Sequence, residues 1–456
     1  MRLNLQKRLQ AWRQDAFLGR VLRNSGYLFT STTFSAFLSF LQGMFAARLL
    51  GIADYGLIAG TVTVFASNVN RLLSFRMSEI TVRYLGESMA QRARDQAAAT
   101  IKRLVLLESL TSLFSFLVLV ALSPWAARTL AKDTTITPWL GFYGLFILAN
   151  PANETATGVL QALDRFNRLA RLNAIQSLIT ASLISLAYWQ GWGRIEVLLA
   201  YWVGKMYLSL ATGWEGWRAL RDELGAQWWQ ASDAQAASWK EILSFALSTN
   251  LNGTVNLLAR DNVTLYLSAL RSQTEVGYLR LGLGLINLVM LPIGPFIWPT
   301  YAELTRTIAE RQWAIARRLL RRVSLIAAAW TVPTSLGLIL LGPWLIPFLY
   351  GEPARPAYPA LVLLLVGYGF ANIFHWNRPL WLALGKPSFP LIAGALAGVL
   401  ELGLTLLLVP HWGYLMQAGL LSLYFLLSIG WLAWKGIKAL QEAEKRNLSQ
   451  TSLPIF

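Results

Sequence analysis

Apolar runs of roughly 20 residues recur along most of this 456-residue chain, and each is long enough to cross a bilayer as a helix. We count twelve of them. Only 14% of the residues are charged and 55% are apolar, which leaves too little charged surface for a water-soluble chain of this length. The sequence therefore predicts an all-α polytopic membrane protein with about twelve transmembrane helices.

The two halves of the chain repeat one another at an offset of about 220 residues. Asp54-Tyr55-Gly56 matches Glu275-Val276-Gly277, and Pro124-Trp125 matches Pro343-Trp344. Six spans in each half is an even number, so both halves enter the bilayer from the same side as parallel repeats. Duplicated halves are frequent in transporters, where the substrate path lies between the repeats.

This reading divides the chain into five segments. We expect an interfacial N-terminal helix over residues 1–22, an N-lobe of spans one to six over 23–217, a cytoplasmic linker over 218–241, a C-lobe of spans seven to twelve over 242–436, and a cytoplasmic tail over 437–456. Prolines that fall inside spans predict bent helices. They are Pro292, Pro295 and Pro299 in span eight and Pro379 in span ten.

The distribution of the net charge of +17 along the chain indicates how the chain is oriented in the membrane. Most lysines and arginines fall in segments on one side of the predicted spans, and by the positive-inside rule that side is cytoplasmic, with both termini. Because no soluble basic face is available, nucleic-acid binding is excluded. The chain has no cysteine and only two histidines, which excludes thiol chemistry and a His-rich metal site, and we expect no cofactor.

Polar side chains form stripes on the first and fourth spans of each half, and they predict a water-filled cavity between the halves. Packing between helices is the alternative for the uncharged members. The stripe residues that we expect to line the cavity are Ser39, Gln42, Asn150, Glu154, Asn250, Asn256, Arg260, Asp261, His375 and Arg378.

Charged residues inside spans are costly and usually face a cavity or a partner. Three arginines lie toward span ends, where they can also reach the interface by snorkelling: Arg71, Arg280 and Arg378. Glu154, Lys205 and Glu401 lie near span centres. For Lys205 and Glu401, a structural ion pair or packing at the back of a lobe is the alternative to a functional role.

Short motifs carry a family resemblance over residues 22 to 436. Ala47-Arg48-Leu49-Leu50-Gly51 followed by Asp54-Tyr55-Gly56, and Leu160-Gln161-Ala162-Leu163 followed by Arg165-Phe166, resemble the bacterial polysaccharide (O-antigen-type) flippases of the MOP superfamily, relatives of the MATE exporters. Asp261 followed by Glu275-Val276-Gly277-Tyr278 is similar to their span seven and eight region. The chain departs from the family in having Ala162 for the usual Gly and in the reversed order of Arg260-Asp261.

The resemblance implies two six-helix lobes in a V and a multi-pass protein of the bacterial plasma (inner) membrane. It implies that a polyprenyl-diphosphate-linked oligosaccharide is flipped from the cytoplasmic to the outer leaflet by alternating access, for surface polysaccharide biosynthesis. The implied partners are this lipid-linked oligosaccharide, membrane lipid and other polysaccharide-assembly membrane proteins. No enzymatic activity is expected.

The chemistry of that substrate assigns roles to the candidate residues. Arginines bind a diphosphate through charge-assisted hydrogen bonds, and for this role we expect Arg48, Arg260, Arg280 and Arg378. Amides and hydroxyls suit sugars, and here we expect Ser39, Gln42, Asn150, Asn250 and Asn256. Glu154, Asp261 and His375 are the candidates for proton or sodium coupling of an antiporter.

Three other functions are weighed against this one. A MATE-type ion-coupled drug or cation exporter shares the fold but favours acids over the five arginines and lysines inside the spans. A major-facilitator transporter has a characteristic inner loop motif, which residues 83–95 do not match. A membrane glycan polymerase or ligase needs a large outer loop, and the longest one expected here, about residues 124 to 138, is short.

Overall fold

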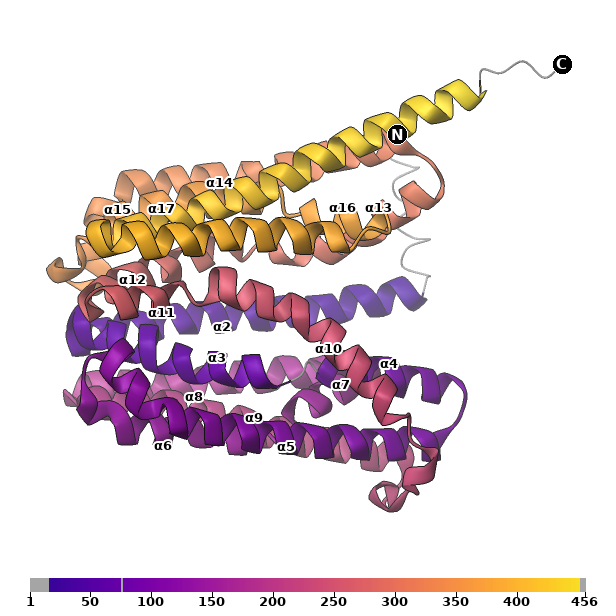
Figure 1. The fold of residues 1–456 in the computed structure, drawn as a ribbon, viewed down its shortest axis with the longest axis horizontal. Coiled ribbons are helices and arrows are strands. Elements are labelled where there is room, and N and C mark those ends of the chain that lie inside the picture. Colours follow the sequence, from indigo (N-terminus) through magenta and orange to yellow (C-terminus); the bar gives the residue numbers. More distant parts are fainter. Residues whose placement is uncertain (1–15, 75–76, 452–456) are drawn as a thin grey trace.

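The computed structural model describes residues 16–74 and 77–451, and these residues form helices joined by short turns, with no strand among them (Figure 1). The predicted all-α fold is thereby confirmed. Of the N-terminal helix predicted over residues 1–22, residues 1–15 lie outside the described part of the chain, and residues from 16 on belong to a long helix.

The first half of the chain ends with two long antiparallel helices, residues 166–190 and 194–224. Its elements are α2 (Ala16–Tyr55), η1 (Gly56–Val62), α3 (Thr63–Leu73), α4 (Met77–Ala90), α5 (Arg94–Ala126), η2 (Ala127–Ala131), η3 (Thr134–Ile136), α6 (Thr137–Leu148), α7 (Asn153–Ala162), α8 (Phe166–Gln190) and α9 (Arg194–Leu224). We call this the N half.

Two single turns, η4 (Trp228–Gln230) and η5 (Asp233–Gln235), connect it to the C half. The elements of the C half are α10 (Trp239–Asn256), η6 (Leu257–Asp261), α11 (Val263–Leu270), α12 (Gln273–Met290), η7 (Gly294–Phe296), α13 (Ile297–Ala309), α14 (Trp313–Tyr350), η8 (Glu352–Ala354), α15 (Ala357–Ile373), α16 (Asn377–Ala383) and α17 (Ser388–Thr451). In Figure 1 the N half forms an indigo-to-magenta layer and most of the C half forms a red-to-yellow layer, while α10 crosses toward the N half.

Six helices among the described residues are long and apolar enough to cross a membrane, or seven when the bent pair formed by α12 and residues 294–309 counts as one. Two of the six, residues 29–73 and 388–445, pass through a glycine that is not helical, Gly51 at φ 75° and Gly413 at φ 68°. Glycine adopts this left-handed backbone at no steric cost, so the chain can turn back there. The number of twelve spans remains a prediction.

The proline-rich stretch of span eight is bent as predicted. The helix axes on either side of residues 291–293 differ by 50°. Pro292 and Pro295 fall in or beside this break, where a proline removes a backbone donor and clashes with the preceding turn.

The hydrophobic core is shared at one end of the molecule and divided at the other. Near the turns at Gly51 and Gly413, one core joins residues of both halves, among them Ile58 and Val276. We call this the Gly56 end. At the opposite end, which carries the linker and which we call the basic end, there are two separate cores: one around Leu104 of the N half, which also includes Ile242 and Ala246 of α10, and one around Leu320 of the C half. The halves are therefore joined mainly at the Gly56 end.

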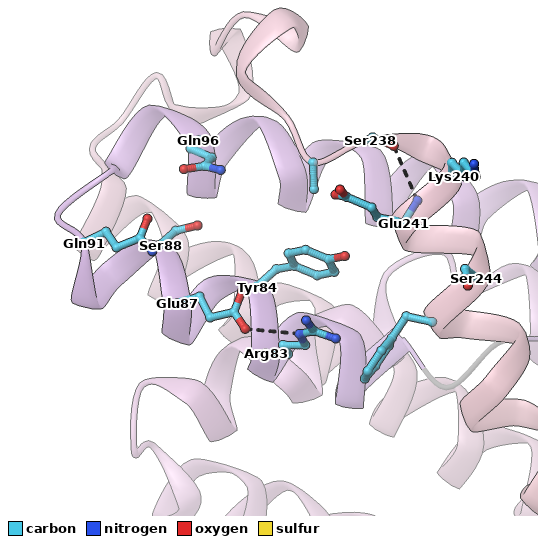
Figure 2. Close-up of a pocket in the computed structure, with 12 residues that line it drawn as sticks. Arg83, Tyr84, Glu87, Ser88, Gln91, Gln96, Ser238, Lys240, Glu241 and Ser244 are labelled. Atoms are coloured by element: carbon cyan, nitrogen blue, oxygen red, sulfur yellow. Dashed lines mark hydrogen bonds and ion pairs between the residues drawn. The ribbon is translucent and has the colours of Figure 1, made fainter.

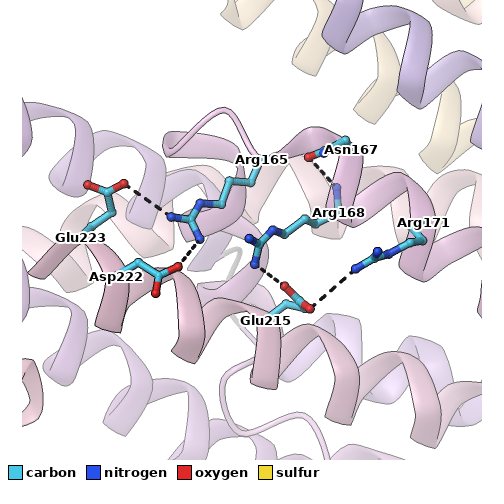
Figure 3. Close-up of polar contacts among 7 residues, drawn as sticks. All are labelled: Arg165, Asn167, Arg168, Arg171, Glu215, Asp222 and Glu223. Carbon is cyan, nitrogen blue, oxygen red and sulfur yellow. Dashed lines mark hydrogen bonds and ion pairs between the residues drawn. The ribbon is translucent and has the colours of Figure 1, made fainter. Parts of the chain in front are cut away.

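At the basic end, ion pairs fasten α8 to α9 (Figure 3). Arg165 lies 3.0 Å from Asp222, and Glu215 accepts from Arg168 at 2.5 Å. Because these arginines already have carboxylate partners, they contribute to the contact between α8 and α9 rather than offer their charge to a ligand.

Candidate functional site

A cavity of about 570 Å³ lies between the two halves, which we call the central cavity. Its walls come from α2, α3, α6 and α9 of the N half and from η6, α11, α12 and α15 of the C half. The lining residues are Ser39, Thr63, Val64, Ser67, Asn68, Arg71, Tyr143, Tyr201, Lys205, Arg260, Asp261, Val263, Thr264, Arg280, Leu283, Asn287 and Tyr368.

The central cavity is strongly basic. Four cationic side chains line it, Arg71, Lys205, Arg260 and Arg280, against one carboxylate, Asp261. Such charges are retained inside a membrane protein where they line an aqueous path or bind a partner of opposite charge. The arrangement can therefore bind an anion.

Asp261 binds two arginines, one in its own half and one in the N half. Arg71 of α3 donates to Oδ2 at 2.9 Å, and Arg260 donates to Oδ1 from its Nε at 2.9 Å. The side chain of Asn68 also reaches across the halves and donates to Asn262 at 2.7 Å. Two of the four cations are thus partly neutralised by one acid.

The other two cations have no such acid. Within the described part of the chain, no carboxylate lies within 4.0 Å of the charged atoms of Lys205 or Arg280. Both side chains are half-buried. Lys205 is on α9 of the N half and Arg280 is on α12 of the C half, so each half presents one cation to the cavity without a carboxylate partner.

Local helix geometry brings the consecutive residues Arg260 and Asp261 to the same wall. They end η6, a π-helical turn that interrupts the path from α10 to α11. Such turns widen a helix and are frequent at functional sites. On the opposite wall, the neighbouring residues Ser67 and Asn68 and the later Arg71 follow one face of α3.

Neutral polar and aromatic groups complete the central cavity. Three tyrosines, Tyr143, Tyr201 and Tyr368, line it together with the hydroxyl of Ser39 and the amide of Asn287. Hydroxyl and amide groups donate and accept hydrogen bonds, and aromatic faces pack on apolar surfaces. The set matches the alternating polar and apolar surface of a sugar.

A second cavity of about 240 Å³ shares Arg71 with the central cavity. Glu154 and Asn250 line it from opposite halves. Glu154 accepts a hydrogen bond of 2.7 Å from Ser78. A line of polar side chains therefore continues from the central cavity through Arg71 to α4, α7 and α10.

A buried carboxylate, Glu108 on α5, fixes the start of α7. It accepts hydrogen bonds from the backbone N–H groups of Glu154 at 2.7 Å and Thr155 at 2.9 Å, and from the Thr155 hydroxyl at 2.6 Å. These are the donors that a helix N-terminus leaves without an intrahelical partner, and a negative charge there also complements the helix dipole. Glu108 thereby positions Glu154.

The structure brings six of the predicted site residues to the two cavities and leaves six elsewhere. Ser39, Arg260, Asp261 and Arg280 line the central cavity, and Glu154 and Asn250 line the second one. The remaining six line neither cavity: Arg48, Gln42, Asn150, Asn256, His375 and Arg378.

Three of these six are engaged in packing between helices. Gln42 is buried and donates to the carbonyl of Ser177 at 3.0 Å. Asn150 accepts from Ser209. Arg48 donates to the carbonyls of Phe348 and Leu349, so it ties α2 to the end of α14.

The other three lie away from both cavities. Asn256 is half-buried on α10. His375 Nδ1 lies 3.2 Å from the carbonyl of Asn372. Arg378 is exposed on α16. For all six residues, the roles assigned from the sequence stay predictions.

Two alternatives considered for the intramembrane charges are wrong. Lys205 and Glu401 do not pair: Lys205 lines the central cavity, whereas Glu401 accepts from Gln417 at 2.9 Å within α17. Arg71 does not snorkel away from the protein, because it binds Asp261. Ser67, Asn68 and Arg71 share one face of α3, and this spacing is a sequence signal from which the cavity position of Arg71 could have been predicted.

A larger cavity has a different character. It measures about 780 Å³ and lies between α4 and the start of α10 (Figure 2). Its charges balance, since Arg83 and Lys240 accompany Glu87 and Glu241. Arg83 already lies 3.1 Å from Glu87. This cavity between α4 and α10 therefore lacks the excess of positive charge that distinguishes the central cavity.

Comparison of the sequence with known proteins matches a family and a relative. A family model described as "Polysaccharide biosynthesis protein" matches residues 21–303. The inner membrane protein YghQ of Escherichia coli (strain K12) is 21% identical over 353 residues, which is 77% of this chain and 98% of that protein.

Two solved structures establish the fold. An inward-facing multidrug resistance MATE family transporter of the MOP superfamily matches with a TM-score of 0.69 and 15% identity, over 90% of this chain and 96% of that one. The lipid II flippase MurJ in an inward closed conformation matches with a TM-score of 0.68 and 14% identity, over 94% of each chain.

Proposed function

This chain belongs to the polysaccharide biosynthesis protein family, and on that basis we propose that it flips a polyprenyl-diphosphate-linked oligosaccharide across the bacterial inner membrane for surface polysaccharide synthesis. The family match and the fold that the chain shares with a lipid II flippase support a lipid-linked substrate. The inner-membrane location of the YghQ relative supports the compartment.

The observation that carries the proposal is the charge of the central cavity. Four cations face one carboxylate, and Lys205 and Arg280 have no acid partner in the described chain. A diphosphate is a compact anion, and hydrogen bonds between charged groups are worth about 1.5–3 kcal/mol each. In a site with little water these interactions strengthen further.

The size and lining of the central cavity fit the polar end of such a substrate. Its volume of about 570 Å³ is within the range of small-molecule sites and is sufficient for a diphosphate with part of a glycan. Tyr143, Tyr201 and Asn287 offer contacts to the sugar. The polyprenyl tail stays in the surrounding lipid, because burying it in a polar cavity would cost hydrophobic free energy.

The joined Gly56 end and the separate cores at the basic end support alternating access. The positive-inside rule makes the basic end cytoplasmic. In the present conformation the halves are sealed toward the outside, and the polar line through Arg71 and Glu154 leads toward the cytoplasm. The substrate would enter from the cytoplasmic leaflet, and transport would require the Gly56 end to open.

Asp261 gives a physical route to ion coupling by protons or sodium. Its carboxylate holds Arg71 and Arg260, so a bound diphosphate competes with Asp261 for the same two arginines. Once displaced from them, Asp261 would take up a cation or a proton. Glu154 and His375 remain further candidates for coupling.

The competing candidate is an ion-coupled exporter of cationic drugs, which the fold shared with a MATE transporter would allow. An excess of three positive charges in the cavity opposes a cationic substrate, since like charges at short distance repel.

Lipid extracts test the proposal. In a strain that lacks this gene, one complete oligosaccharide on a polyprenyl diphosphate should accumulate, and the native gene should clear it. A Lys205→Gln/Arg280→Gln double variant should fail to clear it at a normal protein level. As a matched control, Arg128→Gln changes an exposed arginine that lines neither cavity and should clear it. Sensitivity to cationic drugs with no lipid-linked glycan would favour the exporter instead.

A further inference from the structure

A third cavity, of about 560 Å³, lies on the C half away from the central cavity. It is formed by the first turns of α14, the break between α15 and α16, and the later part of α17. Its lining residues are Ala314, Arg317, Arg318, Leu320, Arg321, Ser324, Leu325, Ala328, Ile373, Phe374, Trp376 and Ile437. None of them lines the central or the second cavity.

The lining of this cavity changes from basic to apolar along the axis of α14. Arg317, Arg318 and Arg321 come first, and Leu325 and Ala328 follow. At 1.5 Å per residue, the distance from residue 318 to residue 328 is about 15 Å. The apolar wall is completed by Phe374 and Trp376, and Trp376 is held by a 2.6 Å hydrogen bond to Ser324.

Two of the three arginines are available to a ligand. Arg317 pairs with Glu444 at 2.8 Å, yet its Nε is buried without a hydrogen-bond partner in the described chain. Arg318 and Arg321 are exposed and have no carboxylate within 4.0 Å among the described residues. One turn apart on the helix, they point to the same side.

The position of the cavity indicates its ligand. The arginines stand where the apolar run of α14 begins, at the level at which a membrane helix meets lipid headgroups. Basic cavities between membrane helices on the cytoplasmic side bind anionic headgroups. We propose that this cavity binds an anionic glycerophospholipid, its phosphate on Arg318 and Arg321 and an acyl chain along Leu325, Ala328 and Phe374. This site is separate from the transport path and does not depend on the proposed function.

Native mass spectrometry of the purified full chain tests the site with phosphatidylglycerol as the probe and phosphatidylcholine as the neutral comparison. We expect a tightly bound phosphatidylglycerol on the native protein. Arg321→Gln should weaken it about fivefold, the loss expected for one basic residue near a membrane surface. The neighbouring Arg322→Gln removes the same charge outside the cavity and should leave binding unchanged.

A second pair of variants tests the apolar part. Ala328→Trp fills the cavity and should reduce phosphatidylglycerol binding, whereas Ala329→Trp changes the adjacent exposed position outside it. Equal losses in Arg321→Gln and Arg322→Gln, or equal binding of the two lipids, would overturn the proposal in favour of diffuse surface charge. Tight binding of glycerol 3-phosphate, which has no acyl chain, would overturn the assignment to a lipid.

Discussion

Gly56 and Gly277 lie against each other at the seam between the two halves: a Cβ built on Gly56 would come within 2.6 Å of the Gly277 nitrogen and 3.0 Å of its Cα. Both glycines are buried, and a Cβ on Gly277 would in turn meet Ile52 at 2.6 Å. They occupy matching positions of the sequence repeat. The two halves therefore seal the Gly56 end through backbone contact at repeat-related positions.

Adding a methyl group to this seal should open it. Gly56→Ala and Gly277→Ala place a Cβ against backbone atoms that cannot move aside, so the conformation sealed at the Gly56 end becomes less populated. Since the chain has no native cysteine, Ala53→Cys and Glu352→Cys can carry spin labels across this end. Double electron–electron resonance should show longer distances between these two labels in both alanine variants than in the native background.

The control for this prediction is Gly284→Ala on the same helix as Gly277, where a Cβ meets nothing within 4 Å. It should keep the native distance distribution. Distances in Gly56→Ala that overlap those of the control would show that the glycine contact does not hold the seal.

Neutralising Asp261 should release both of its arginine partners. In Asp261→Asn, Arg71 and Arg260 lose their carboxylate, so a polyprenyl diphosphate should bind more tightly than to the native protein. If Asp261 carries the coupled ion, the dependence of flipping on the proton or sodium gradient should disappear in the same variant. Weaker binding of the diphosphate would contradict the competition between ligand and carboxylate.

Removing the buried cap of α7 should destabilise the N half. Glu108→Ala leaves two backbone N–H groups and one hydroxyl without their acceptor, and each buried unsatisfied group costs about 1–3 kcal/mol. The melting temperature of the purified protein should fall, with a smaller fall in Glu108→Gln, which keeps one acceptor. Ser115→Ala is the control on the same helix, because Ser115 bonds only to its own helix. A melting temperature of Glu108→Ala equal to that of Ser115→Ala would contradict the role of Glu108 as the cap of α7.

The linker should detach when its contact with α5 is lost. Hydrogen bonds from Arg103 lower the pKa of Asp233, which lies outside the spans. A lowered pKa means that the contact stabilises the fold above the ordinary Asp pKa of about 3.9 and is lost as pH falls through the folded value. At neutral pH, Asp233→Asn should therefore speed amide exchange over residues 228–238, whereas Asp222→Asn at the α8–α9 pair should not. Equal rates in both variants would contradict docking by Asp233.

The sequence predicted the fold better than it predicted the cavity. The repeated Asp54-Tyr55-Gly56 and Glu275-Val276-Gly277 indicated two related halves, and long apolar runs fixed the helices. Because apolar length reports which segments are helical but not how each helix is rotated, polar stripes could not distinguish a cavity from a packed interface. Gln42 and Asn150 illustrate this, since both bond to neighbouring helices.

Whether the remaining residues belong to the site depends on the tertiary structure. Lys205 belongs to the cavity because α9 presents it to the space between the two halves, which no local spacing reveals. The capping role of Glu108 could not be predicted from the sequence, because its partners, the first N–H groups of α7, lie 46 and 47 residues later in the chain. Arg260 and Asp261, by contrast, were identifiable as adjacent charges in an apolar span.

The most direct test of an anion-binding central cavity is equilibrium binding to the purified chain in lipid nanodiscs, comparing undecaprenyl diphosphate with undecaprenol. We expect only the diphosphate to bind specifically. The Lys205→Gln/Arg280→Gln double variant should weaken this binding at least about tenfold, as loss of a charge-assisted hydrogen bond implies, while Arg128→Gln should have no effect. Equal binding of both lipids, or full binding by the double variant, would contradict an anion-binding central cavity.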